Sequence, residues 1–319
     1  MSRADDEIGF HLDMLTRELI DSGMPAEAAR AEALRRFGEP EALRRSLADA
    51  QRRGVDTALT ILAFVFVLCA HRLLSYLPQY RWLHTHRPYY VAESLKNLLE
   101  AGVCVAALLL MRQRRVARAL AIDRRVLAGL AFGLACTWPM LIGFAVAHRS
   151  DVASWISVAY LAFFSPFIEE VVTRGFAFRS LRRAGWPLWP AALACGLLTG
   201  IGHIEKGQTA LQILGIFVFT GIGSATFCWL VERWQSLWFP FALHALMDFW
   251  WEVFNVAPTV LGGWYALVLQ NASILLAILI TVRFTRRPIS RPVGEDRRRD
   301  RDELYVRRQM QQRVITAGP

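Results

Sequence analysis

The apolar positions of the chain gather between residues 55 and 284, in eight stretches that each approach the roughly 20 residues that a membrane-spanning helix needs. They cover residues 55–77, 94–111, 126–147, 153–181, 188–205, 209–231, 236–256 and 262–284. The second stretch fits least well, because Lys96 and Glu100 lie in its first turns. The pattern predicts an all-α, polytopic membrane protein of about eight transmembrane helices.

Residues 1–54 follow a different pattern, with apolar positions spaced as in short amphipathic helices. We expect a first helix that ends at Gly23 and a second that ends at Gly38. A third is expected to begin at Pro40 and to run towards Arg53. Three such helices bury little apolar surface and form a marginal domain alone, so we expect a protein partner or the membrane surface to complete this soluble prefix.

The composition agrees with a membrane location, since 54% of the 319 residues are hydrophobic and 20% are charged. Soluble domains contain about 45–50% apolar and about 25% charged residues. The difference excludes a single soluble globule, a disordered chain and a secreted disulfide scaffold. The five cysteines lie singly in apolar runs without a CxxC pair, which argues against a zinc ribbon or a redox centre.

The net charge of +10 comes mostly from arginines, and their distribution predicts an orientation. Arginines crowd the connection 112–125, the stretch 179–183 and the tail 285–319, whereas the alternate connections carry few. Because basic loops stay in the cytoplasm, we expect both termini there, in a bacterial inner membrane. The tail is expected to be disordered and to contact anionic lipid, so the basic charge predicts membrane lipid and no nucleic acid as a partner.

Ionisable residues interrupt the second half of the apolar region, where a charged side chain costs roughly 2.5–3.5 kcal/mol on insertion scales. They are Glu169, Glu170, Arg174, His203, His244 and Asp248. Glu170 with Arg174, and likewise His244 with Asp248, are four residues apart and share a helix face. Counted from the expected cytoplasmic helix ends, Glu169, His203, His244 and Asp248 all lie ~12–22 Å deep at ~1.5 Å per residue.

Three readings of this layer remain open. It can be a structural network in which opposite charges neutralise each other and fix the packing of the helices. It can be a proton or ion pathway of a transporter, which also buries carboxylates and histidines. It can be a hydrolytic site, where a carboxylate acts as general base on a water, a histidine gives a second proton site and hydrogen-bond donors stabilise an oxyanion.

Three segments, "EEVVTRG", "GLLTGIGH" and "SLWFPFALHALMD", resemble the ordered motifs EExxxR, FxxxH and HxxxN or HxxxD of the CPBP family, the CAAX-prenyl-protease and bacteriocin-processing (Abi) endopeptidases. The likeness extends over residues 163–251. It implies an intramembrane endopeptidase whose cavity opens to the cytosol or the bilayer, acting on a peptide or membrane protein. The prefix resembles the cytoplasmic prefix of bacterial ABC-type permeases, which implies a docking or regulatory appendage. The rival is a non-catalytic membrane scaffold or permease-associated protein.

The resemblance implies roles for the six ionisable residues. Glu169 and His203 would activate the attacking water. His244 and Asp248 would lie near the developing oxyanion, and the second glutamate and the arginine of the first motif would form a supporting pair. Bacteriocin-leader or membrane-protein processing is favoured over cleavage of a prenylated protein, because the arginine-rich loops are typical of bacterial membrane proteins.

Two positions depart from the family pattern. Thr199 replaces the aromatic residue of FxxxH, which removes a packing wall beside His203. Asp248 stands where many members have asparagine, and an ionised aspartate cannot donate to an oxyanion. Asp248 is therefore expected to be a protonated donor or an orienting partner of His244. The residue types also suit zinc, but no HExxH motif is present and the resemblance favours metal-free chemistry without a cofactor.

Small residues recur at helical spacing in two of the expected spans. Gly129 and Gly133 form a GxxxG pair in the third, and Gly196 and Gly200 form one in the fifth. Such pairs let two helices approach closely, so we interpret them as packing surfaces.

Overall fold

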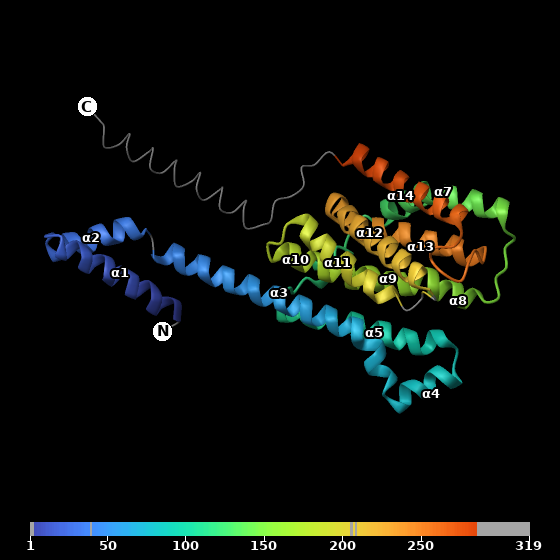
Figure 1. Cartoon of the computed structure of the whole chain (residues 1–319), viewed down its shortest axis with the longest axis horizontal. Coiled ribbons are helices and arrows are strands. Elements are labelled where there is room, and N and C mark those ends of the chain that lie inside the picture. Colours follow the sequence, from blue (N-terminus) through green and yellow to red (C-terminus); the bar gives the residue numbers. More distant parts are fainter. Residues whose placement is uncertain (1–2, 39, 205–206, 208, 286–319) are drawn as a thin grey trace. The chain divides into compact units, whose positions relative to one another are not determined.

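The computed structural model describes residues 3–285 apart from 39, 205, 206 and 208 (Figure 1). The described residues form helices and connections without a strand, which confirms the all-α class. The chain divides into two compact units, residues 1–56 and residues 57–319. The predicted tail lies outside the described residues, apart from residue 285.

The first unit contains a helical hairpin made of α1 (Arg3–Asp21) and α2 (Ala26–Phe37). The two glycines expected to end these helices, Gly23 and Gly38, both adopt positive φ angles, of 95° and 86°. A left-handed backbone of this kind favours glycine and stops a helix. The hairpin closes over a small core of Leu12, Leu19, Ala29 and Ala33.

The third predicted helix does not end near Arg53. It continues without a break as α3 (Pro40–Ser75) into the first predicted span. Gly54 is the one residue with a low helix propensity at the junction, and a glycine inside a helix costs only about 1 kcal/mol relative to alanine. The prediction failed because the change from polar to apolar composition was taken for a change of element.

The second unit is a bundle of helices. Its elements are α4 (Pro78–His86), α5 (Tyr89–Leu110), α6 (Val116–Ala119), α7 (Val126–Ala147), α8 (Trp155–Ala159), η1 (Tyr160–Phe164), α9 (Ser165–Glu170), η2 (Val171–Phe178), α10 (Arg179–Arg183), α11 (Leu188–His203), α12 (Ala210–Trp234), α13 (Trp238–Val253) and α14 (Trp264–Phe284). Every predicted apolar stretch overlaps one of these elements, a continuous run of them, or α3, and the described residues of a stretch extend at most three residues beyond it.

Five helices among the described residues are long and apolar enough to cross a membrane, and α11 is a shorter apolar helix. The five are the Arg44–Ala70 part of α3, α7, the continuous run Trp155–Arg183, α12 and α14. The two other predicted spans form α5, which carries three charged residues, and α13, which has 16 residues. The expected number of eight crossings is therefore not confirmed.

The continuous run from α8 to α10 contains two π-helical segments, η1 and η2. They flank α9, which carries Glu169 and Glu170. Every residue of η2 is buried. π-helical turns occur often at functional sites, and here one lies immediately before and one immediately after the short helix that carries both glutamates.

The two GxxxG pairs lie at close helix crossings, as predicted. A Cβ atom on Gly129 would come within 2.6 Å of the Trp238 backbone, and one on Gly133 within 2.7 Å of the Ala242 backbone. These contacts seat α7 against α13, the helix of His244. Gly196 and Gly200 bring α11 equally close to the backbone of α12.

The arginine-rich connections of the second unit meet at one end of the bundle, which we call the arginine-rich end (residues 112–125, 179–187 and 232–238). Arg179 Nε and Arg183 Nη1 donate to the Ala119 carbonyl at 2.8 and 2.9 Å. The Ser236 hydroxyl donates to the Arg124 carbonyl at 3.0 Å. The helices therefore alternate in direction as the charge pattern predicted.

Candidate functional site

A cavity of about 520 Å³ lies among η1, α9, η2, α11, α12, α13 and α14. Five of the six predicted site residues line it: Glu169, Arg174, His203, His244 and Asp248. The sixth, Glu170, lies beneath the cavity wall with its side chain fully buried. The three motifs, which are spread over about 80 residues of sequence, thus meet in one place.

Glu170 joins two of the motifs. Its Oε1 atom accepts a hydrogen bond from Arg174 Nη1 at 3.1 Å and another from His244 Nδ1 at 2.9 Å. The pair with Arg174 was predicted from the spacing along one helix. The contact with His244 crosses from α9 to α13 and has no signal in the periodicity of either helix. A carboxylate that accepts two such bonds fixes both partners in position.

Glu169 differs from its neighbour because its side chain is 31% exposed and faces the cavity. Arg174 Nη1 lies 3.5 Å from Glu169 Oε1 as well, so one guanidinium serves both carboxylates. The guanidinium carbon also lies 5.3 Å from the centre of the Phe227 ring, a cation–π contact. Phe227 lines the cavity and was not singled out by the sequence.

His244 lies between two carboxylates. Its Nδ1 faces Glu170 and its Nε2 lies 3.4 Å from Asp248 Oδ2. Because Glu170 also accepts from a guanidinium, it is an acceptor, and Nδ1 therefore carries a proton. A hydrogen bond between Nε2 and Asp248 then requires one more proton, held either by Asp248 or by the imidazole. Both roles considered for Asp248 are compatible with this geometry.

His203 is the last residue of α11, and its Nδ1 lies 2.9 Å from the Thr199 carbonyl. A carbonyl only accepts, so Nδ1 is the donor and Nε2 is the acceptor atom of the neutral ring. The Thr199 hydroxyl accepts a hydrogen bond from Ser224 at 3.1 Å. The residue that replaces the family's aromatic position therefore forms a polar contact between α11 and α12.

Other polar residues of the cavity were missed by the sequence analysis. Glu252 follows Asp248 by four residues, and this spacing was the available signal. Gln270 on α14 donates from Nε2 to the Val260 carbonyl at 3.2 Å, and Trp251 donates from Nε1 to the Ala257 carbonyl at 3.0 Å. These bonds hold the loop after α13 against the cavity, and its residues 257–260 form part of the wall.

The residue types in the cavity raise the question of a metal. Among the residues that the structure describes, no group of three or more His, Cys, Asp or Glu side chains is arranged to hold a metal ion. The contacts of His244 with Glu170 and Asp248 instead form a hydrogen-bonded chain.

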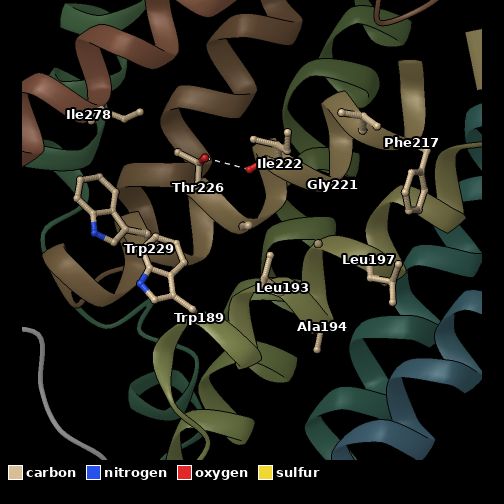
Figure 2. Close-up of a pocket in the computed structure, with 13 residues that line it drawn as sticks. Trp189, Leu193, Ala194, Leu197, Phe217, Gly221, Ile222, Thr226, Trp229 and Ile278 are labelled. Atoms are coloured by element: carbon tan, nitrogen blue, oxygen red, sulfur yellow. Dashed lines mark hydrogen bonds between the residues drawn. The ribbon is translucent and has the colours of Figure 1, made fainter. Parts of the chain in front are cut away.

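Figure 2 shows a second cavity of about 990 Å³, formed largely by α11 and α12. Its lining is apolar apart from two indole rings and Thr226, whose hydroxyl donates to the Ile222 carbonyl at 2.9 Å. No ionisable residue lines it. Of the two cavities, only the smaller one is therefore lined by ionisable side chains.

The family model described as Rce1-like, type II CAAX prenyl endopeptidase, matches residues 151–250. This range contains all three motifs and both π-helical segments. Comparisons with curated proteins and with solved structures found no match. The apolar helices and this match support an integral membrane protein, and the matched family implies a peptide or protein substrate in the membrane. By its three motifs and this match, the region of residues 151–250 is similar to the Rce1-like, CAAX-type endopeptidases of the CPBP family.

Proposed function

We propose that the chain hydrolyses a peptide bond in or near the membrane with a water activated by Glu169 and His203. The observation that carries the proposal is the contrast between the two adjacent glutamates. Glu170 is fully buried and bonded to Arg174 and His244, whereas Glu169 faces the cavity. One carboxylate thus has a positioning role, and the other faces the cavity that a substrate would enter.

In the proposed reaction Glu169 accepts a proton from water as the water oxygen attacks the carbonyl carbon of the substrate. A general base of this kind contributes typically about 10²–10⁴-fold to the rate. His203 gives the second proton site, since its Nε2 is the acceptor atom of the neutral ring. When the C–N bond breaks, the proton taken from water passes to the leaving amine and a carboxylic acid remains on the other product.

The oxyanion formed by the attack needs a hydrogen-bond donor. We assign this role to Asp248 in its protonated form, next to His244. In this scheme Asp248 carries the proton that the contact between His244 Nε2 and Asp248 Oδ2 requires. The alternative is an anionic Asp248 that orients the imidazole or takes part in holding a zinc ion.

Arg174 has a positioning role in this scheme. Two adjacent carboxylates repel each other when both are charged, and a guanidinium within 3.5 Å of both offsets this repulsion. Glu170 transmits this arrangement to α13 through its bond to His244. The prefix, residues 1–54, is proposed to dock or regulate, with a protein partner.

The test is a comparison of newly formed protein termini in membranes that contain either the wild-type chain or Glu169→Gln. The amide keeps the shape of the side chain but cannot accept the proton, so termini that depend on the wild type should disappear. The matched control is Glu232→Gln, a buried glutamate of α12 outside the cavity lining, which should keep the wild-type pattern per folded molecule. If Glu169→Gln yields the same termini as the wild type, the proposal is wrong and the scaffold interpretation replaces it.

A further inference from the structure

The cavity occupies one half of the bundle rather than its middle. On α13 its lining residues begin at His244 and end at Glu252, in the last ten residues of the helix. On α11 they are confined to the last turn, Thr199 and His203. Residues 257–260, in the loop after α13, complete the wall.

That half belongs to the end of the bundle opposite the arginine-rich end. We call it the arginine-poor end and define it by the connections 148–154 and 254–263. The two connections meet where the Asp151 backbone N–H donates to the Val253 carbonyl at 3.2 Å. Arg149 is the one arginine or lysine in these connections. Among the described residues, none of the arginine-rich end lines the cavity.

Helix lengths give the depth of the site. At ~1.5 Å per residue, His203 lies ~22 Å from Leu188, where α11 begins, and at the arginine-poor end of that helix. Asp248 lies ~15 Å from the start of α13 and ~8 Å from its end at Val253. Both residues are therefore closer to the arginine-poor surface of the membrane than to the other surface.

The exposure of the carboxylates agrees with a water-filled cavity that reaches this end. The side chain of Asp248 on α13 is 40% exposed, and that of Glu169 is 31% exposed although it lies in the candidate span Trp155–Arg183. Ionisable groups at such depth face the bundle interior or a water-filled space. The nearest surface for that water is the arginine-poor end, where the loop 257–260 meets the cavity.

We propose that the cavity receives its substrate from the extracytoplasmic side of the membrane. Arginine-rich connections stay in the cytoplasm, so the arginine-poor end faces away from it. The inference deepens the proposed protease function and rests on it for the substrate. It names the substrate class as exported or membrane-anchored polypeptides whose cleaved bond lies in the outer half of the membrane. It differs from the cytosol-facing cavity that the family resemblance implies, and it excludes soluble cytosolic proteins as substrates.

The access route is tested with a membrane-impermeant maleimide on spheroplasts. The protein carries single cysteines in a background whose five native cysteines are replaced by alanine and whose membrane-protein cleavage is first checked against the wild type. Thr259→Cys reports the loop and Thr220→Cys reports the cavity wall. Ala117→Cys, exposed in α6 at the arginine-rich end, is the control.

We expect Thr259→Cys and Thr220→Cys to be labelled to the same extent before and after lysis of the spheroplasts. Ala117→Cys should rise from background only after lysis. Labelling of Ala117→Cys in intact spheroplasts, or labelling of the two cavity cysteines only after lysis, overturns the proposal.

A second arm separates this inference from the protease function. Labelling repeated with Glu169→Gln should be unchanged, because access depends on the fold and not on proton transfer. Sites cleaved by the wild type and not by Glu169→Gln should lie in the extracytoplasmic half of their substrates' spans or just outside it. Cleavage sites at cytoplasmic span ends would leave the protease function intact and refute the outward-facing cavity.

Discussion

Two buried arginine–glutamate pairs in the same bundle differ in how many of their nitrogen and oxygen atoms have hydrogen-bond partners. Arg182 at the arginine-rich end donates to Glu232 from Nη2 at 2.8 Å and from Nε at 3.4 Å, and its Nη1 donates to the Trp186 carbonyl at 2.7 Å. All three nitrogens of this guanidinium have an acceptor, and neither side chain is more than 10% exposed. The pair is closed, and neither of its residues lines either of the two cavities described above.

The pair in the cavity is left incomplete. Arg174 divides one nitrogen between two glutamates, and its Nε is buried without a hydrogen-bond partner among the described residues. Glu170 Oε2 is buried without a partner as well. Such groups cost free energy and are rare in native interiors, except where function requires them. Both sites contain a buried ion pair, so the ion pair itself does not distinguish them. The difference is that polar atoms of the candidate site lack hydrogen-bond partners, whereas those of the structural pair have them.

The difference between the two pairs is tested most directly by replacing Arg174 and Arg182 in turn. Loss of one partner from a buried pair costs about 3–5 kcal/mol, so Arg174→Met and Arg182→Met should both lower the melting temperature strongly. Only Arg174→Met should also abolish cleavage per folded molecule, because it leaves Glu169 and Glu170 to repel each other. The measurement is thermal unfolding in detergent together with cleavage normalised to folded protein. Equal normalised rates for the two variants would remove the distinction.

Asp248→Asn sharpens the assignment inside the cavity. If Asp248 is a protonated donor, the amide still donates, and most of the activity should remain. The wild type should lose rate as the pH rises and the acid ionises, and the variant should not, because an amide cannot ionise. The measurement is a pH–rate profile of both proteins with and without a chelator. A loss of about 10–100-fold in the variant, the scale of changes beside a metal ligand, with a chelator-sensitive wild type, contradicts both the donor role and the metal-free reaction.

Gly133→Ala tests whether α7 positions the third motif. The new Cβ atom would lie 2.7 Å from the Ala242 backbone, two residues before His244, so α13 has to shift. Overpacking of this kind costs typically about 1–3 kcal/mol, and we expect a decrease in cleavage of the folded protein as well. Gly102→Ala on α5 is the control, because its Cβ meets nothing within 4 Å and a glycine-to-alanine change in a helix gains up to about 1 kcal/mol. Unchanged cleavage in Gly133→Ala would show that the crossing only supports the fold.

The smallest effect is expected for an exposed cluster in the prefix. Side-chain hydrogen bonds from Arg35 and Arg36 lower the pKa of Glu32 from 4.5 to about 2. A folded-state pKa below the unfolded value stabilises α2 above about pH 4.5, and this contribution is lost as the pH falls towards 2. Because the two arginines of the cluster are 77% and 57% exposed, water screens these contacts and the change should be slight. Hydrogen exchange of α2 amides should quicken between pH 5 and 3 beyond the intrinsic pH dependence, and Glu32→Gln should remove this excess.

The sequence predicted the contacts between side chains of the same helix. The spacing of four residues identified the pairs Glu170 with Arg174 and His244 with Asp248, and both form. The bond between Glu170 and His244 could not be predicted, because helical periodicity reports the face of one helix and not which helix lies opposite. The π-helical segments have no periodic signal of their own in so apolar a run.

The sequence predicted the distance of His203 from the start of its helix, but not where that distance places the residue in the bundle. The count that put His203 ~22 Å from the start of its helix was correct in the structure. Because α11 ends at that residue, the same number puts it at the far end of the helix and not at mid-membrane. Helix ends depend on local chain geometry and packing, which an apolar stretch of sequence locates only within a few residues. The orientation itself, with cytoplasmic termini, stays a prediction.

The central claim is that Glu169 is the base of a peptide hydrolysis and that Glu170 and Arg174 hold its surroundings in place. The most direct test is the cleavage rate of one membrane-protein substrate by wild type, Glu169→Gln and Glu232→Gln in proteoliposomes, with the folded amount of each protein measured. The account predicts a fall of about 10²–10⁴-fold for Glu169→Gln with unchanged melting, and a wild-type rate for Glu232→Gln. A wild-type rate for Glu169→Gln, or an equal loss in both variants, would contradict it.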